Sequence, residues 1–183
     1  TIILGNTSNA FTGAVTFAGP TLGGVTVANT GAFDLGALTL GAGANLVVTA
    51  TGAVTQSGVL TVPGTTSISA AGQLVTLTLA NDFTGAVSVD GLTVQLTDTN
   101  SIVLGGSTVT DTYTVIASAG DITQAASSPL VVTNAASFTV NGGGTTITLN
   151  DAANSFGSTV AFAGAALANV TVVDITSFDF GAV

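Results

Sequence analysis

Apolar and polar residues alternate in short bursts along the whole chain. Val15 and Phe17 enclose one polar residue, and Leu38 and Leu40 enclose another. The bursts have a period of two, are rich in β-branched residues and are bounded by Gly, Asn, Asp, Ser or Pro, which is typical of short strands with one buried face. No segment has the apolar spacing of an amphipathic helix. The pattern therefore predicts an all-β protein.

One segment occurs three times, as NAFTGAVTF at residues 9–17, NDFTGAVSV at 81–89 and NSFGSTVAF at 154–162. Such constant spacing indicates a tandem array with a period of about 72–73 residues. Residues 31–38 likewise resemble residues 176–183, two repeats later. We interpret residues 1–183 as one segment of about two and a half repeats, with copies starting near positions 9, 81 and 154, and expect it to be an excerpt of a longer array.

Each repeat contains about nine short strands, roughly one every eight residues, which suits either a sandwich of hairpins or a solenoid. Hairpins favour Asn-Gly or Asp-Gly turns, and only Asp90-Gly91 and Asn141-Gly142 qualify. Tandem repetition favours the solenoid, so we predict a parallel β-helix (β-solenoid) with about 18–24 residues per coil. Three strands per coil would give about 24 residues and three coils per repeat, and coils of about 18–20 residues with four per repeat remain an alternative.

Eight residues mark structural positions shared by the repeats. We expect each Asn of the repeated segment to cap a corner of a coil with its side-chain amide, while the Phe two residues later fills the core. Three coils would separate successive Asn residues by about 14 Å, too far for direct stacking. The two Gln residues end the matching strands GAVTQ and GDITQ. The eight positions are Asn9, Phe11, Asn81, Phe83, Asn154, Phe156, Gln56 and Gln124.

The charge inventory excludes several functions. The 183 residues carry nine acidic groups, all Asp, and no Lys, Arg or His, giving a formal net charge of −9. Without cations the chain cannot neutralise phosphates, which excludes nucleic acid as a partner and attraction to anionic membranes. No apolar run approaches the roughly 20 residues of a membrane-spanning helix. No Cys is present, so neither disulfides nor thiol chemistry is available.

Catalytic and metal sites are weakly indicated. Glycoside hydrolysis requires two carboxylates at a suitable separation, and Asp82, Asp90 and Asp98 lie close in sequence. We favour solvated corner residues instead, because Asp stabilises turns through its own backbone hydrogen bonds. A calcium-binding repeat would place Asp two residues after a Gly-rich run, whereas residues 142–144 are followed by threonines. We therefore predict no enzyme activity and no cofactor, with calcium as a minor alternative.

The repeats resemble a known family. The GxVTQ and GxITQ segments, NDFTGAV, and LTDTNSIVLG at residues 96–105 are similar to filamentous-haemagglutinin-like adhesins and related autotransporter passengers of Gram-negative bacteria. The resemblance spans essentially the whole chain. It implies a right-handed parallel β-helix, export through an outer-membrane partner or translocator, and a place in a stalk or adhesive fibre at the cell surface.

These observations lead to one favoured function and two alternatives. We expect a structural or adhesive segment of an extracellular fibre or giant exported surface adhesin, with other copies of itself, or a host or neighbouring-cell surface or matrix, as partners. The first alternative is a self-assembling filament or sheath subunit that joins through its coil ends, where unpaired backbone groups can meet a neighbour. The less favoured alternative is a glycan hydrolase that uses paired Asp residues.

Overall fold

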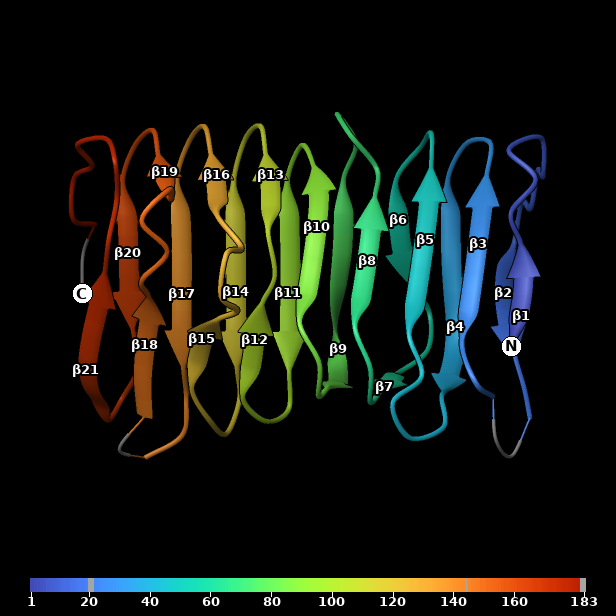
Figure 1. Ribbon diagram of the computed structural model, residues 1–183, viewed down its shortest axis with the longest axis horizontal. Helices are drawn as coiled ribbons and strands as arrows, with labels where there is room; N and C mark the ends of the chain where they lie inside the picture. Colours follow the sequence, from blue (N-terminus) through green and yellow to red (C-terminus); the bar gives the residue numbers. More distant parts are fainter. Residues whose placement is uncertain (20–21, 144, 182–183) are drawn as a thin grey trace.

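The chain winds into a β-solenoid of about 8 turns with about 21 residues per coil. The computed structural model describes residues 1–19, 22–143 and 145–181. Figure 1 shows the coils stacked along the long axis, with the two termini at opposite ends. The predicted parallel β-solenoid is confirmed, and its coils fall within the expected length of about 18–24 residues. Gly144 of the glycine run, and residues 182 and 183 of the late repeat match, lie outside the described residues.

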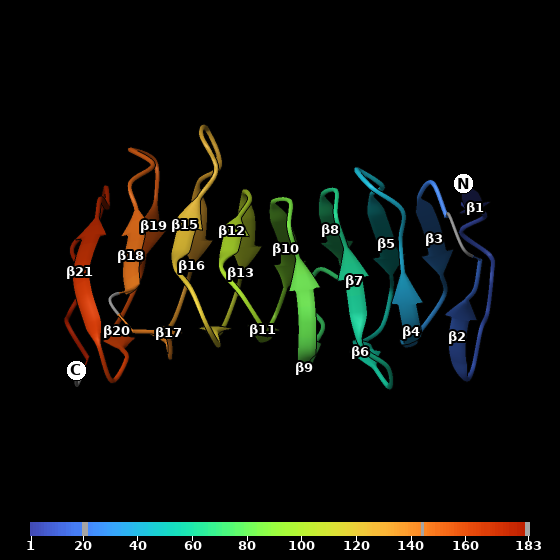
Figure 2. The same cartoon turned by 90° about the horizontal axis from the view of Figure 1, so that it is seen from below.

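Two parallel sheets, seen as two rows of strands in Figure 2, form opposite walls of the solenoid. In the described part of the chain, sheet A has 12 strands and sheet B has nine. Sheet A contains β1 (Ile2–Leu4), β3 (Val25–Asn29), β5 (Leu46–Ala50), β8 (Thr66–Ser69), β10 (Val87–Gly91), β12 (Ile102–Leu104), β13 (Ser107–Val109), β15 (Ile122–Gln124), β16 (Leu130–Val132), β18 (Thr145–Leu149), β19 (Ser155–Phe156) and β21 (Leu167–Val172). Sheet B contains β2 (Ala14–Phe17), β4 (Phe33–Thr39), β6 (Val54–Gln56), β7 (Leu60–Val62), β9 (Val75–Phe83), β11 (Val94–Asp98), β14 (Tyr113–Ala117), β17 (Ala136–Val140) and β20 (Val160–Ala163).

The register between strands gives the coil length directly. In sheet A, Val25 pairs with Leu46 and Leu46 pairs with Thr66. In sheet B, Val54 pairs in parallel with Val75 of the next coil. Each pairing joins residues about one coil apart, so the inner strands make their backbone hydrogen bonds to the coils above and below them, and the strands of the end coils pair on one side. Across the residues that the structure describes, no helix is long and apolar enough to cross a membrane.

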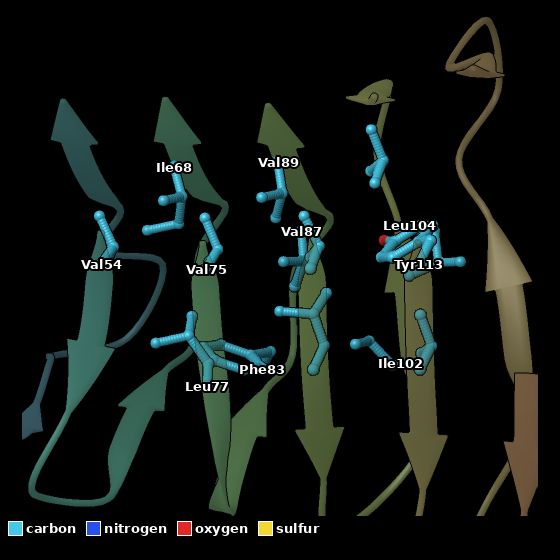
Figure 3. Packing of buried hydrophobic residues seen from close by; sticks show 14 of the residues in the cluster. Val54, Ile68, Val75, Leu77, Phe83, Val87, Val89, Ile102, Leu104 and Tyr113 are labelled. Carbon is cyan, nitrogen blue, oxygen red and sulfur yellow. The ribbon is translucent and has the colours of Figure 1, made fainter. Parts of the chain in front are cut away.

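The core fills the space between the two sheets. β5 shows the pattern that builds it, because its first, third and fifth residues are buried and the two between them are exposed. Figure 3 shows side chains such as Val75 and Leu77 of sheet B and Val87 and Val89 of sheet A, all of which belong to one buried cluster. The alternation in the sequence therefore maps residue by residue onto inward and outward positions.

The sequence repeat is not a whole number of coils. TIIL at residues 1–4 resembles TITL at residues 146–149, two repeats later. The strands formed there, β1 and β18, both lie in sheet A and are seven steps apart along the strand order. The matching strands β6 and β15, one repeat apart, lie in sheet B and sheet A respectively. One repeat is therefore about three and a half coils, and the expected three or four coils per repeat is wrong. Successive repeats present the same residues on opposite walls.

Several strands are interrupted within a sheet. β6 and β7 are consecutive segments of sheet B, and β15 and β16 are consecutive segments of sheet A. Coils with three strand segments therefore occur, as predicted. The average coil has about 21 residues rather than the roughly 24 predicted for three separate strands, because two of the three segments belong to the same sheet. Gln56 and Gln124 end the first segment of each pair, and Asn81 and Asn154 of the following coil lie beside the two connections.

Candidate functional site

The most elaborate polar cluster of sheet B is a pair of side-chain amides. Gln56, at the end of β6, donates to Asn81 Oδ1 (2.8 Å), and Asn81 Nδ2 donates back to Gln56 Oε1 (2.9 Å). Asn81 Oδ1 also accepts the backbone N–H of Leu60 (3.0 Å). Asn81 Nδ2 further donates to the carbonyls of Leu77 and Thr97 (3.2 Å each). Asn81 is fully buried, so these bonds satisfy an amide that would otherwise be costly to bury.

The same cluster recurs in sheet A, bond for bond. Gln124 donates to Asn154 Oδ1 (2.6 Å), and Asn154 Nδ2 donates to Gln124 Oε1 (3.1 Å). Asn154 Oδ1 accepts the backbone N–H of Leu130 (2.8 Å). Asn154 Nδ2 donates to the carbonyls of Leu149 (3.2 Å) and Val173 (3.1 Å). Each cluster thus ties three successive coils together through one buried Asn.

Asn9, in the first copy, makes the two bonds to backbone carbonyls but forms no hydrogen bond with a Gln side chain among the described residues. Its Nδ2 donates to the carbonyls of Leu4 (2.9 Å) and Ala28 (3.1 Å), and the side chain is partly exposed. The sequence predicts that each of the three Asn residues caps a corner of a coil. Asn81 and Asn154 instead lie beside the breaks between two strand segments of one sheet. There each Asn accepts a backbone N–H, of Leu60 or Leu130, that the neighbouring strand does not bond.

The Phe residues of the repeated segments are held by a side chain from the next coil. Phe83 and Phe156 are buried in the core, and Phe11 packs against it while remaining partly exposed. In each copy, an Asn or Asp oxygen accepts the backbone N–H of the Phe. These bonds run from Phe11 N to Asn29 Oδ1 (2.8 Å), from Phe83 N to Asp98 Oδ2 (2.7 Å) and from Phe156 N to Asp174 Oδ1 (2.9 Å).

Sequence reasoning missed these three capping residues, although a signal for them exists. They follow the Phe of their copy by 18, 15 and 18 residues, close to one coil. With the coil length known, an Asn or Asp at that interval would have indicated a residue of the next coil that accepts the Phe N–H. The contacts of the three repeat copies therefore involve the eight predicted positions together with Asn29, Asp98 and Asp174.

Asp98 corrects the expectation that the Asp residues are solvated corners. Its side chain is fully buried, and its two oxygens accept the N–H groups of Phe83 (2.7 Å) and Asn100 (2.7 Å). Burial raises the pKa of Asp98, the two backbone hydrogen bonds oppose that rise, and the nearby carboxylate of Asp82 adds to it. Asp98 thus has the environment of a capping group, because each of its oxygens accepts one backbone N–H and its side chain is buried.

The three Asp residues considered for glycoside hydrolysis are not gathered into one site. Asp82 lies in β9 of sheet B, and Asp98 lies near it at the end of β11. Asp90 lies in β10 of sheet A, where its Oδ1 accepts the N–H of Thr108 (3.2 Å). Within the described ranges, no group of three acidic side chains is arranged to hold a metal ion.

Two adjacent segments of the chain, residues 22–90 and 91–163, match a family model described as "Repeats of unknown function (DUF5649)". The two segments together cover well over half of the chain and follow each other without a gap. No curated protein and no solved structure matches the chain.

Proposed function

This chain belongs to the DUF5649 repeat family. We propose that it is a rod segment of a bacterial extracellular fibre or giant exported surface adhesin, without catalysis of its own. The observation that carries the proposal is the recurrence of the Gln–Asn cluster on alternate walls. One repeat is about three and a half coils, so the next repeat begins on the opposite wall and continues the same two sheets. Further repeats therefore lengthen the rod without changing its core. Such a unit suits a spacer of adjustable length.

The extracellular and adhesive part of the proposal rests on sequence. The repeats resemble filamentous-haemagglutinin-like adhesins, which favours the surface of a Gram-negative bacterium. The absence of Lys and Arg also removes every cleavage site of trypsin-like proteases, a property that suits a long-lived extracellular rod. Its partners on this proposal are other copies of the rod and a host or neighbouring-cell surface or matrix.

The proposal is tested on cells that produce the protein, with an antibody raised against this chain. We expect the antibody to label intact cells and to detect, under full denaturation, a chain many times heavier than 17.5 kDa. Labelling only after the cells are opened would overturn the extracellular role. A denatured mass near 17.5 kDa, or a small multiple of it, would instead support a filament or sheath subunit that assembles through its coil ends.

The absence of catalysis is tested separately. The hydrolase alternative requires that a polysaccharide incubated with the protein yields new reducing ends. We expect none, because the buried carboxylate of Asp98 already accepts two backbone hydrogen bonds and Asp90 lies in the other sheet. New reducing ends that disappear in an Asp82→Asn variant would overturn this part of the proposal.

A further inference from the structure

An open groove of about 620 Å³ lies between two loops of sheet A. One wall is the connection between β15 and β16, and the other is the connection between β18 and β19 in the next coil. Figure 2 shows both connections projecting from the same side of the solenoid. The groove is therefore a surface feature built on top of the Gln124–Asn154 cluster.

The groove arises from residues inserted into the second repeat. In sheet B, residues 57–59 join Gln56 to the next strand, and Gln56 Nε2 donates to the carbonyl of Gly58 (2.7 Å). In sheet A, residues 125–129 make the same connection, and Gln124 Nε2 donates to the carbonyl of Ser128 (2.8 Å). The Gln anchors the end of the loop in both repeats, so the two additional residues bulge outward and leave the core unchanged.

The walls of the groove are made of small side chains. Ala125, Ala126, Ala152 and Ala153 line it, and no aromatic residue is among the lining residues. Ser127, also in the lining, has a φ of 53°, the only positive φ of a non-glycine residue in the described ranges. Because these side chains are short, a partner backbone can approach the loops closely, whereas a sugar ring would find no aromatic surface to stack on.

Asp151 is the single charged residue in the lining of the groove. Its Oδ2 accepts the N–H of Ser128 in the opposite wall (2.8 Å), and its Oδ1 accepts the N–H of Ala153 (2.9 Å). The carboxylate is thus fixed between the two loops, and each oxygen has a further lone pair for another donor. No Lys, Arg or His exists anywhere in the chain to neutralise it.

We propose that this groove is a docking site for an extended segment of a partner protein that carries Lys or Arg, with the cationic side chain paired to Asp151. Charge complementarity identifies the occupant: a chain with a net charge of −9 and no basic residue attracts positive partners, and the groove offers them a fixed carboxylate between open walls. The inference is independent of the proposed rod function, which would stand if the groove bound nothing.

The test follows backbone amide chemical shifts of the chain by nuclear magnetic resonance while a capped peptide of alternating Lys and Ala is added. The matched control peptide has Glu in place of Lys. In about 0.15 M salt, where long-range attraction is screened, we expect shifts concentrated in residues 125–129 and 150–153 with the Lys peptide and none with the Glu peptide. Shifts spread evenly over all nine Asp residues would show diffuse attraction only and would overturn the proposal.

Variants locate the contact. Asp151→Asn is expected to weaken Lys-peptide binding about tenfold, through loss of a charge-assisted hydrogen bond. Asp90→Asn is the matched control, because Asp90 also accepts a backbone N–H but lies outside the groove, and we expect unchanged affinity. Equal losses in the two variants would contradict the proposal.

A loop exchange keeps the proposal testable if Asp151→Asn disturbs the loops. Replacing residues 125–129 with Ser-Gly-Val, the sequence at 57–59, removes one wall while retaining a carbonyl for Gln124, as in the first repeat. We expect the exchanged chain to keep its β-rich circular dichroism spectrum and to lose peptide binding. Full binding by the folded exchange variant would overturn the proposal.

Discussion

The side-chain amides of Gln124 and Asn154 exchange two hydrogen bonds, of 2.6 Å and 3.1 Å, between adjacent coils of sheet A. Gln56 and Asn81 form the same pair in sheet B. The pair is preserved although 30 residues separate its members in sheet A and 25 in sheet B. The loops between the paired residues therefore vary in length while the amide contact fixes how the coils stack.

Replacing Asn154 with Ala is expected to destabilise the fold strongly. The change leaves the Leu130 N–H and the Leu149 and Val173 carbonyls, as well as Gln124, without their amide partner in a buried setting. At about 1–3 kcal/mol for each buried group left unpaired, we expect a loss of at least about 3 kcal/mol in the free energy of unfolding. Urea denaturation followed by circular dichroism measures the loss.

Asn9→Ala is the matched control for this substitution. Asn9 is partly exposed and donates only to the Leu4 and Ala28 carbonyls, so water can replace part of what is lost. We expect a clearly smaller loss of stability. If the two variants unfold at the same urea concentration, the amide pair with Gln124 contributes nothing beyond the two carbonyl contacts.

The sequence identified the Asn and Gln positions but not their pairing. Repetition alone revealed Asn81, Asn154, Gln56 and Gln124, because each recurs with its neighbours. The pairing depends on which coils lie side by side, and the spacing of the repeated segments does not determine the number of coils within one repeat. The alternation of apolar and polar residues predicted the fold class. The half-coil offset between successive repeats could be found only from the coil length, which strand pairings such as Val54 with Val75 provide.

Tyr113 illustrates a core position that tolerates a polar atom. The side chain is fully buried, and burial raises the pKa of its hydroxyl, while the nearby Ser107 side chain acts in the opposite direction. The Ser107 hydroxyl already accepts the Val89 N–H and donates to the Gly105 carbonyl, and the tyrosine hydroxyl makes no hydrogen bond among the described residues. The ring packs edge-on against Phe138 at a centroid distance of 5.9 Å. Tyr113→Phe removes the unpaired hydroxyl and keeps the ring, so we expect an unchanged free energy of unfolding or a gain of up to about 1 kcal/mol.

Thermal unfolding followed by circular dichroism checks the Tyr113→Phe prediction. Tyr113→Ala provides the contrast, because it removes the ring as well and is expected to cost about 3–5 kcal/mol. A loss of more than about 1 kcal/mol for Tyr113→Phe would mean that the hydroxyl has a partner.

Gly58 is expected to be intolerant of any side chain. A Cβ at this position would overlap the backbone N and Cα of Ala37 in the preceding coil, and backbone cannot rotate away as a side chain can. We expect Gly58→Ala to cost about 1–3 kcal/mol through overpacking. Gly13→Ala is the control, since nothing lies within 4 Å of a Cβ there, and its effect should stay within about 0.5 kcal/mol. Similar denaturation midpoints for both variants would contradict the close approach.

The last prediction concerns the pH dependence of stability and rests on Asp98. Burial raises its pKa in the folded state above the ordinary value of 3.8, so the folded chain holds this proton more tightly than the unfolded chain does. The contribution of Asp98 to stability is therefore fully present below pH 3.8 and is lost as the pH rises through the raised pKa. We expect the free energy of unfolding to fall over this interval, by about 1.4 kcal/mol for each unit by which the pKa is raised.

Asp98→Asn isolates this contribution from the general repulsion among nine carboxylates. Asn29 already occupies the equivalent position in the first copy and accepts the Phe11 N–H, so an amide suits the site. Relative to the unchanged chain, the variant should gain stability as the pH rises from about 3 to 7. Asp111→Asn should show the opposite trend, because hydrogen bonds from Asn134 and Thr93 lower the pKa of Asp111 and its contribution is lost as the pH falls. Parallel stability curves for Asp98→Asn and the unchanged chain would show that the buried carboxyl titrates as it does in water.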